Sequence, residues 1–230
     1  MSKFVFESTM FGMALTISSY LLGVYLKNKF KLAIMNPLLL SVIISILVLV
    51  VFRIDYDDYY ESAKYVSYLL TPATVCLAIP LYQKIALLKK YAAAIFVGII
   101  AGVISSLGSV LGFAVLFQLT HEEYVTLLPK SITTAIGIGV AEEHGGIVTI
   151  TVAVIIVTGL LGNMLAESIC KMFKITNPVA KGIAIGTSSH AVGTAKAMEM
   201  GEVEGAMSSL AIVVAGICTV IGAAVFVQFW

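Results

Sequence analysis

The sequence predicts an all-α polytopic membrane protein with about seven transmembrane helices, one re-entrant segment and an inverted-topology repeat that contains two or three broken helices. Composition gives the first reason. Of 230 residues, 60% are hydrophobic and 12% are charged, with a mean hydropathy of +1.03. Soluble domains carry about 25% charged residues, and a soluble core of this size cannot hide so much apolar surface. We therefore treat residues 1–230 as a single integral membrane domain.

The second reason is the length of the apolar stretches. A helix needs about 20 mostly apolar residues to cross the hydrocarbon layer. Two further segments, residues 124–144 and 182–198, are apolar but broken by polar groups, and residues 65–82 are uncharged but contain Pro72 and Pro80. The stretches that meet or nearly meet the length without a charge are residues 9–26, 32–52, 91–120, 145–166 and 205–230.

Loop charges give the third reason and an orientation, because lysines and arginines in short loops mark the cytoplasmic side. Basic clusters follow the first span, the third span and the 145–166 span. This pattern predicts an outside N-terminus and spans that run in, out, in and out. Residues 124–144 then re-enter on one face, residues 145–166 run inward, residues 182–198 cross outward to the acidic 199–204 loop, and the last span ends in the cytoplasm. The basic residues are Lys27, Lys29, Lys31, Lys84, Lys89, Lys90, Lys171, Lys174 and Lys181.

The order of segment types also predicts a repeat. Residues 32–120 and residues 145–230 each contain a helix, a polar-broken helix and a long glycine-rich helix, and the loops of the two sets carry opposite charge. Inverted repeats with broken helices are typical of secondary transporters.

The first broken segment contains Thr71-Pro72-Ala73-Thr74. Non-helical backbone is tolerated in a membrane where protein or water satisfies it, so this break predicts a polar lining that includes Thr71 and Thr74. A simple proline kink, with both hydroxyls bonded to the backbone, is an equally good interpretation.

The second broken segment contains Pro129-Lys130-Ser131-Ile132-Thr133-Thr134 between apolar neighbours. A lysine at membrane depth is costly and usually functional, although it can also extend to the interface. Pro129 is suited to start a helix, whose free N–H groups and dipole favour an anion. We therefore predict a binding site for a small organic anion at Lys130, Ser131, Thr133 and Thr134.

The third broken segment, residues 186–195, places two glycines, four hydroxyls and a histidine inside an apolar run. The glycines permit chain reversal or close backbone approach, and the hydroxyls can cap a new helix. His190 titrates near physiological pH, so it could bind an anion or carry a coupled proton; a buried structural histidine is the alternative. The predicted substrate-binding residues here are Thr187, Ser188, Ser189, His190, Gly193 and Thr194.

Other classes of site are weakly indicated. A net charge of +1 argues against a nucleic-acid partner, and Cys76, Cys170 and Cys218 are too scattered for a disulfide framework. Glu142 and His144 lack further metal ligands. No carboxylate accompanies His190 and the neighbouring serines as nucleophilic catalysis requires. We therefore expect no cofactor, no metal and no enzymatic activity.

Several motifs together resemble the LrgB/CidB family over nearly the whole chain. The last two are the most distinctive. The motifs are Asn36-Pro37-Leu38-Leu39, Thr71-Pro72-Ala73-Thr74, Ala78-Ile79-Pro80-Leu81-Tyr82, Leu128-Pro129-Lys130-Ser131-Ile132-Thr133-Thr134, and residues 182–195 followed by Glu202-Val203-Glu204-Gly205-Ala206.

The resemblance implies a bacterial plasma membrane protein with one of two functions. Plastid relatives are described as glycolate/glycerate translocators and bacterial members are tied to pyruvate, which implies a secondary transporter of small monocarboxylates, with protons or sodium as the candidate coupling ions. Bacterial members are also called antiholin-like or murein hydrolase regulators, which implies a holin/antiholin-type membrane component that modulates murein hydrolase export and cell lysis. Such proteins act with a small holin-like membrane partner, LrgA/CidA, and we expect a homodimer in the lipid bilayer.

Overall fold

The computed structural model describes residues 10–30 and 35–230 and is entirely helical over those residues. The chain divides into two compact units, Met1–Cys76 and Leu77–Trp230. Parts of the first two predicted spans fall on residues 1–9 and 31–34 and lie outside the described residues. The all-helical architecture and the long apolar helices confirm the predicted class of polytopic membrane protein.

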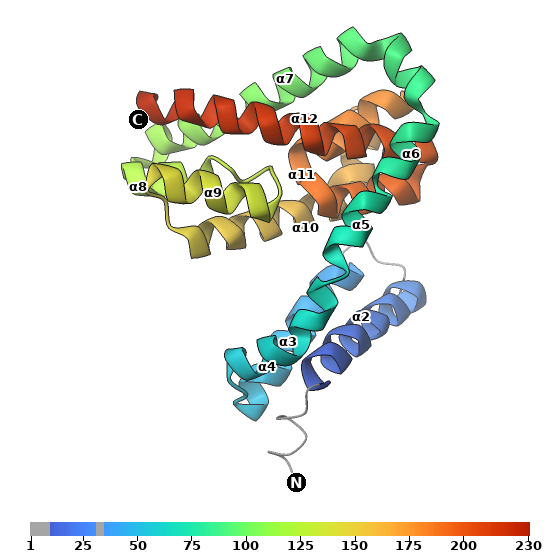
Figure 1. The fold of residues 1–230 in the computed structure, drawn as a ribbon, viewed down its shortest axis with the longest axis vertical. Coiled ribbons are helices and arrows are strands. Elements are labelled where there is room, and N and C mark those ends of the chain that lie inside the picture. The colour runs from blue at the N-terminus through green and yellow to red at the C-terminus, as the bar shows by residue number, and fades with distance from the viewer. Residues whose placement is uncertain (1–9, 31–34) are drawn as a thin grey trace. The chain divides into compact units, whose positions relative to one another are not determined.

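The first unit packs α2 (Phe11–Phe30) against α3 (Pro37–Phe52) and α4 (Tyr56–Ser67), and it ends with α5 (Leu70–Cys76) (Figure 1). Gly12 lets α2 approach α4 closely enough for its backbone N–H to donate to Ser62 Oγ at 2.7 Å. Near the other end of α2, Gly23 meets the backbone of Pro37. Asn36 starts α3 by accepting from the N–H groups of residues 38 and 39.

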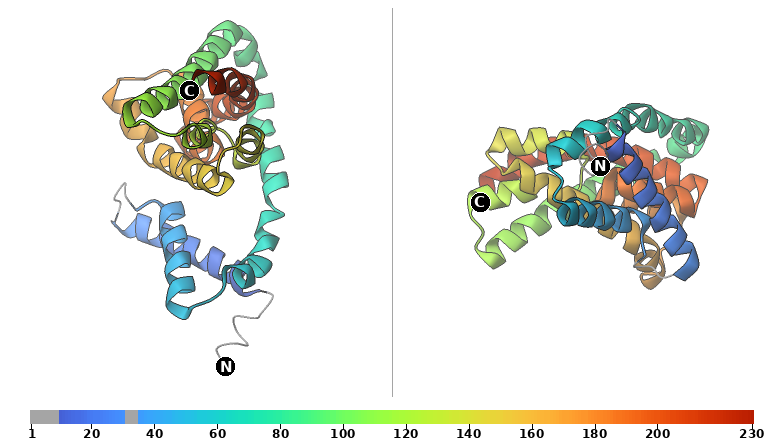
Figure 2. Two further views of the ribbon diagram at one scale, coloured as in Figure 1. Left: turned by 90° about the vertical axis from the view of Figure 1, so that its left-hand side faces the viewer. Right: turned by 90° about the horizontal axis from the view of Figure 1, so that it is seen from below.

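The second unit is built on three long helices, α7 (Ile85–Phe117), α10 (Val148–Met172) and α12 (Glu202–Phe226). Shorter elements complete the unit: α6 (Ala78–Gln83), α8 (His121–Leu127), α9 (Thr134–His144), the broken helix α11 (Pro178–Met200) and the 3-10 helix η1 (Val227–Phe229). Figure 2 shows α7 in green and α12 in red lying side by side.

By length and composition, four helical stretches of the described residues can cross a membrane. They are α7, α10, α12 extended by η1, and the run Tyr56–Gln83, which comprises α4, α5 and α6. The helix α3 is as apolar but has only 16 residues. The predicted count of seven crossings includes one by residues 182–198, which the structure does not show as a crossing; the predicted repeat boundaries stay predictions.

The helices α7 and α12 run in the same direction. Lys84, just before α7, forms an ion pair of 2.8 Å with Glu202 at the start of α12. At the opposite end, the Tyr124 hydroxyl donates to the Phe226 carbonyl and the Trp230 indole donates to the Leu119 carbonyl, both at 2.8 Å. We call these the Glu202 end and the Trp230 end of the unit. The loop charges predict opposite directions for these two spans, and that prediction is wrong.

The segment from α8 to α9 is a re-entrant hairpin, as predicted. The two helices have 7 and 11 residues, which give about 10 and 16 Å against a hydrocarbon thickness of about 30 Å. The chain returns to its starting level, because Thr126 Oγ1 in α8 accepts from the Ile147 N–H at 2.8 Å and the Thr126 carbonyl accepts from the Thr151 hydroxyl at 2.9 Å. This hairpin therefore enters from the Trp230 end.

The helix α11 is a second hairpin, which the sequence does not predict. Its backbone breaks at His190, with φ 42° and ψ −140°. A Cβ at Gly193 would lie 3.1 Å from Ile185 Cγ2 and 3.3 Å from the Ile185 carbonyl oxygen, a contact that a straight helix cannot make at that spacing. Residues 191–200 therefore fold back along residues 178–189.

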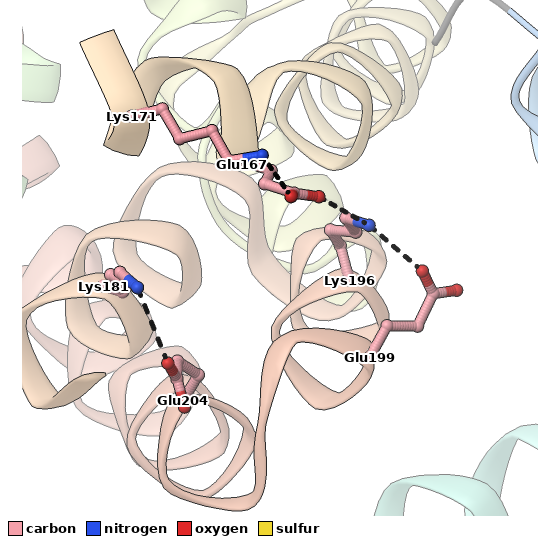
Figure 3. A network of polar contacts seen from close by, with 6 residues as sticks. All are labelled: Glu167, Lys171, Lys181, Lys196, Glu199 and Glu204. Carbon is pink, nitrogen blue, oxygen red and sulfur yellow. Dashed lines mark hydrogen bonds and ion pairs between the residues drawn. The ribbon is translucent and has the colours of Figure 1, made fainter. Parts of the chain in front are cut away.

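Ion pairs at the two ends of α11 confirm that it begins and finishes at the Glu202 end. Lys181, in its first turn, lies 3.9 Å from Glu204 of α12. Lys196, in its second half, lies 3.4 Å from Glu167 of α10 and 3.2 Å from Glu199 (Figure 3). The predicted outward crossing by residues 182–198 is therefore wrong. The acidic charge of residues 199–204 predicts the other side of the membrane, but these carboxylates form ion pairs with lysines at the Glu202 end.

Candidate functional site

A cavity of about 1280 Å³ lies in the second unit and is open on one side, where Leu161, Leu165 and Ile169 of its wall are exposed; the tips of both hairpins reach it. Its walls come from α7, α10 and the first half of α11. Lys130 and Ser131 reach it from the break between α8 and α9, and Thr187, Ser188 and Ser189 reach it from the turn of α11. The two broken segments that are predicted to form a site thus line one space.

Glycines on α7 and α10 allow the α11 hairpin to lie this close. A Cβ at Gly102 would lie 2.6 Å from Thr187 Cγ2, and a Cβ at Gly159 would lie 2.6 Å from His190 Cε1. At Gly162, the Ser189 side chain occupies the space that a Cβ would take. Small residues at helix contacts are the usual means of close packing in membranes. On α7, close packing of this kind is seen at Gly102, whereas a Cβ added at Gly108 or Gly112 would have no neighbour within 4 Å.

Lys130 is the charged group of the cavity. Its Nζ donates to Ser106 Oγ at 3.0 Å and to Ser131 Oγ at 3.1 Å, and the Ser106 hydroxyl donates to Ser131 Oγ at 3.0 Å. In the second unit, every residue of which is described, no carboxylate forms an ion pair with Lys130. Since a buried charge without an opposite charge is unfavourable, this ammonium group favours a bound anion.

Thr187 adds an unsatisfied polar group to the same wall. Its side chain is 5% exposed, and its hydroxyl has no hydrogen-bond partner. Buried hydroxyls in proteins almost always have a partner. A ligand in the cavity would supply one.

His190, Gly193 and Thr194 lie behind the cavity rather than on its wall. His190 is buried, and its Nε2 lies 3.0 Å from the carbonyl oxygen of Ile155 in α10, to which a protonated Nε2 donates. The Thr194 hydroxyl lies 2.7 Å from Ser208 Oγ and 2.9 Å from the His190 carbonyl oxygen. Asn163 Nδ2 donates to the Val192 carbonyl at 2.8 Å. These bonds give hydrogen-bond partners to the backbone carbonyls of His190 and Val192 at the reversal. They offset the positive φ of His190, which costs about 1–3 kcal/mol for a residue other than glycine.

The remaining predicted residues do not line the cavity. Thr133 is the N-cap of α9, although its side chain makes no capping bond, and Thr134 is the first residue of that helix; both are half-buried. Thr71 is exposed on α5 of the first unit, and the side chain of Thr74 lies outside the described residues.

Ser105 and Ser106 line the cavity from the middle of α7 but are not among the predicted residues. The pattern that indicates them in the sequence is a pair of adjacent hydroxyls at the centre of an apolar span.

The fold and the cavity define a multi-pass membrane protein with two re-entrant hairpins that enter from opposite ends and line one open cavity. The model of the LrgB-like family matches residues 16–229, and the chain belongs to this family.

Relatives are similar over almost the whole chain. The antiholin-like protein LrgB of Bacillus subtilis (strain 168) is 38% identical over 226 residues, which cover 96% of this chain and 98% of that protein. The holin-like protein CidB of Staphylococcus epidermidis is 37% identical over 203 residues, covering 88% of this chain and 89% of CidB. The chain matches no solved structure. It is a multi-pass bacterial membrane protein.

Proposed function

We propose that this chain is a holin/antiholin-type membrane component that modulates murein hydrolase export and cell lysis. The names of its relatives, antiholin-like LrgB and holin-like CidB, carry this proposal. The small holin-like membrane partner and the homodimer expected from the sequence belong to the same proposal.

The geometry favours a second function, the transport of a small monocarboxylate. The observation that carries it is Lys130, which projects into a cavity between two hairpin tips without a carboxylate partner. Broken helices that meet near the middle of the membrane are typical of the binding sites of secondary transporters. Coupling to protons or sodium is part of this proposal. The two functions are compatible, because flux of a weak acid can itself influence lysis.

The basic loops favour one orientation. Lys84, Lys171, Lys174 and Lys181 lie at or near the Glu202 end of the unit, and we propose that this end is in the cytoplasm. The helix α12 would then end outside, and so would the C-terminus, contrary to the cytoplasmic position expected from the sequence. The outside N-terminus stays a prediction.

One variant separates the two functions. Purified protein in liposomes is tested for uptake of glycolate, pyruvate and lactate under proton or sodium gradients, and Lys130→Gln is compared with Lys90→Gln, an exposed lysine outside the cavity. The transport proposal predicts that only Lys130→Gln abolishes uptake. In cells that lack the native protein, autolysis is then measured with both variants.

The uptake and autolysis results with Lys130→Gln distinguish the two functions. Autolysis that changes only with Lys130→Gln would mean that lysis control follows from transport. Normal autolysis with Lys130→Gln would mean that lysis control depends on assembly. Folded protein without uptake under any gradient contradicts the transport proposal.

A further inference from the structure

The cavity is polar at one end and apolar along the rest of its length. Along α7, Ser105 and Ser106 lie at the level of the hairpin tips, whereas Ala94 and Gly98 lie nearer the Glu202 end. Along α10, Thr158 precedes a wall of Leu165, Ala166 and Ile169. The helix α11 starts at the Glu202 end. Its apolar Ile183 and Ala184 therefore lie nearer that end, and the hydroxyls of residues 187–189 lie at its hairpin tip. Three separate elements thus place their polar groups at the same end.

The size of the cavity exceeds the need of a three-carbon acid. At about 1280 Å³, it is larger than the roughly 300–1,000 Å³ of sites that enclose drug-sized ligands. A small hydrophilic anion at Lys130 would leave the apolar wall uncovered, including Leu161, Leu165 and Ile169, which are 42–49% exposed. An apolar ligand chain laid along this wall leaves water itself, which is favourable in proportion to the area removed.

From this distribution we propose that the cavity binds a monocarboxylate with an apolar chain of about six to eight carbons. The carboxylate accepts from Lys130 Nζ and from the unpartnered hydroxyl of Thr187, both of which lie at the polar end. The chain extends toward the Glu202 end along Ile183 and Ala184. This inference rests on the transport proposal, since it names the class of carboxylate that the same site takes.

A competition experiment measures how the apolar wall responds to chain length. Radiolabelled hexanoate is bound to the protein in lipid nanodiscs, with empty nanodiscs as the baseline, and it is displaced by acetate, butanoate, hexanoate and octanoate. Each added methylene is expected to lower the inhibition constant about fourfold, the effect of burying one methylene group. Hexanamide reports the contribution of the charge and should compete at least tenfold more weakly than hexanoate.

Two variants locate the two ends of the ligand. Ala184 faces the cavity, so Ala184→Phe fills its apolar part and should weaken octanoate while leaving acetate unchanged. The matched control is Ala93→Phe, an exposed position on α7 outside the cavity. Lys130→Gln should bring hexanoate to the level of hexanamide.

The outcomes distinguish this inference from the proposal beneath it. Equal affinity for acetate and octanoate, or octanoate binding that Ala184→Phe leaves intact, overturns the apolar-chain inference while a short carboxylate can still be transported. Equal affinity for hexanoate and hexanamide overturns the assignment of Lys130. Absence of binding by every carboxylate contradicts both proposals. Displacement of hexanoate by phospholipid but not by octanoate identifies a lipid chain as the occupant and overturns the inference.

Discussion

Replacing Gly186 with alanine tests the contact between the first half of α11 and α12. A Cβ at this position would meet the carbonyl oxygen of Ser208 and would lie 2.8 Å from both Ser208 Cα and Ala211 Cβ. Ordinary contacts of this kind begin at 3.4 Å. The obstructing atoms belong to backbone and to a Cβ that cannot rotate away. Relief of the two contacts at 2.8 Å alone needs about 0.6 Å of separation, and the closer carbonyl oxygen needs more, so the helices must move apart and lose dispersion contacts.

The loss of stability in Gly186→Ala can be compared with the effect of the same substitution at a glycine that has no neighbours. Overpacking of a well-packed contact costs about 1–3 kcal/mol, and alanine returns up to about 1 kcal/mol through its higher helix propensity. Gly112→Ala on α7 gains the propensity without the clash, since nothing lies within 4 Å of the place its Cβ would take. The difference between the two variants should therefore be about 1–3 kcal/mol, or about 2–12 °C in the midpoint of unfolding for a chain of this size.

A thiol-reactive fluorescent dye measures this midpoint in detergent. Cys170 is buried in α10 of the same unit and becomes reactive when the unit unfolds, whereas the exposed Cys76 contributes a constant baseline. If Gly186→Ala unfolds at the same temperature as Gly112→Ala, or above it, α11 does not lie against α12 as described.

Three further predictions follow from other contacts. With the native cysteines replaced by alanine, Thr176→Cys and Glu199→Cys should react with an impermeant reagent from one side of the membrane and Glu122→Cys from the other; labelling of residues 176 and 199 from opposite sides would contradict the α11 hairpin. Lys181→Ala should destabilise the protein by about 1–3 kcal/mol in thermal unfolding, because it leaves the nearly buried Glu204 without its partner. The control is Lys171→Ala, which removes an exposed ion pair. It should change stability by about 0.5 kcal/mol or less. The Thr120 N–H and hydroxyl hold the pKa of Glu123 below its usual value; this stabilisation of α8 is complete above the unfolded pKa of about 4.3 and is lost as pH falls through the folded pKa. The protection factors of the α8 amides, which compare exchange with the intrinsic rate at each pH, should therefore fall on acidification in the native protein, and Glu123→Gln should show no such fall.

Composition and apolar length predict the features that depend on one segment at a time. The long helices α7, α10 and α12 follow from uninterrupted apolar runs, and the break between α8 and α9 follows from Pro129 and Lys130 within such a run. Gly145 ends α9 in the left-handed conformation, which is common for a glycine after a helix. These properties are local, so a single sequence is enough to reveal them.

The α11 hairpin is missed because its evidence is not local. Loop charge places residues 199–204 outside, but Glu204 pairs with Lys181 and Glu199 with Lys196. A carboxylate that is paired with a lysine does not indicate a side of the membrane. Only the three-dimensional structure shows which charges are paired. His190 is similarly assigned to the site by its neighbours in sequence, whereas its contacts are with Ile155 and Gly159.

The reversal at His190 has a consequence for how the protein is assembled during biosynthesis. A hairpin with backbone groups freed at its turn and with Lys181 and Lys196 in its arms is a poor substrate for direct entry into lipid. Its hydrogen-bonding partners are Ile155 and Asn163 of α10 and Ser208 of α12. We therefore expect those helices to enter the bilayer first, so that α11, although it is made before α12, takes its place after it.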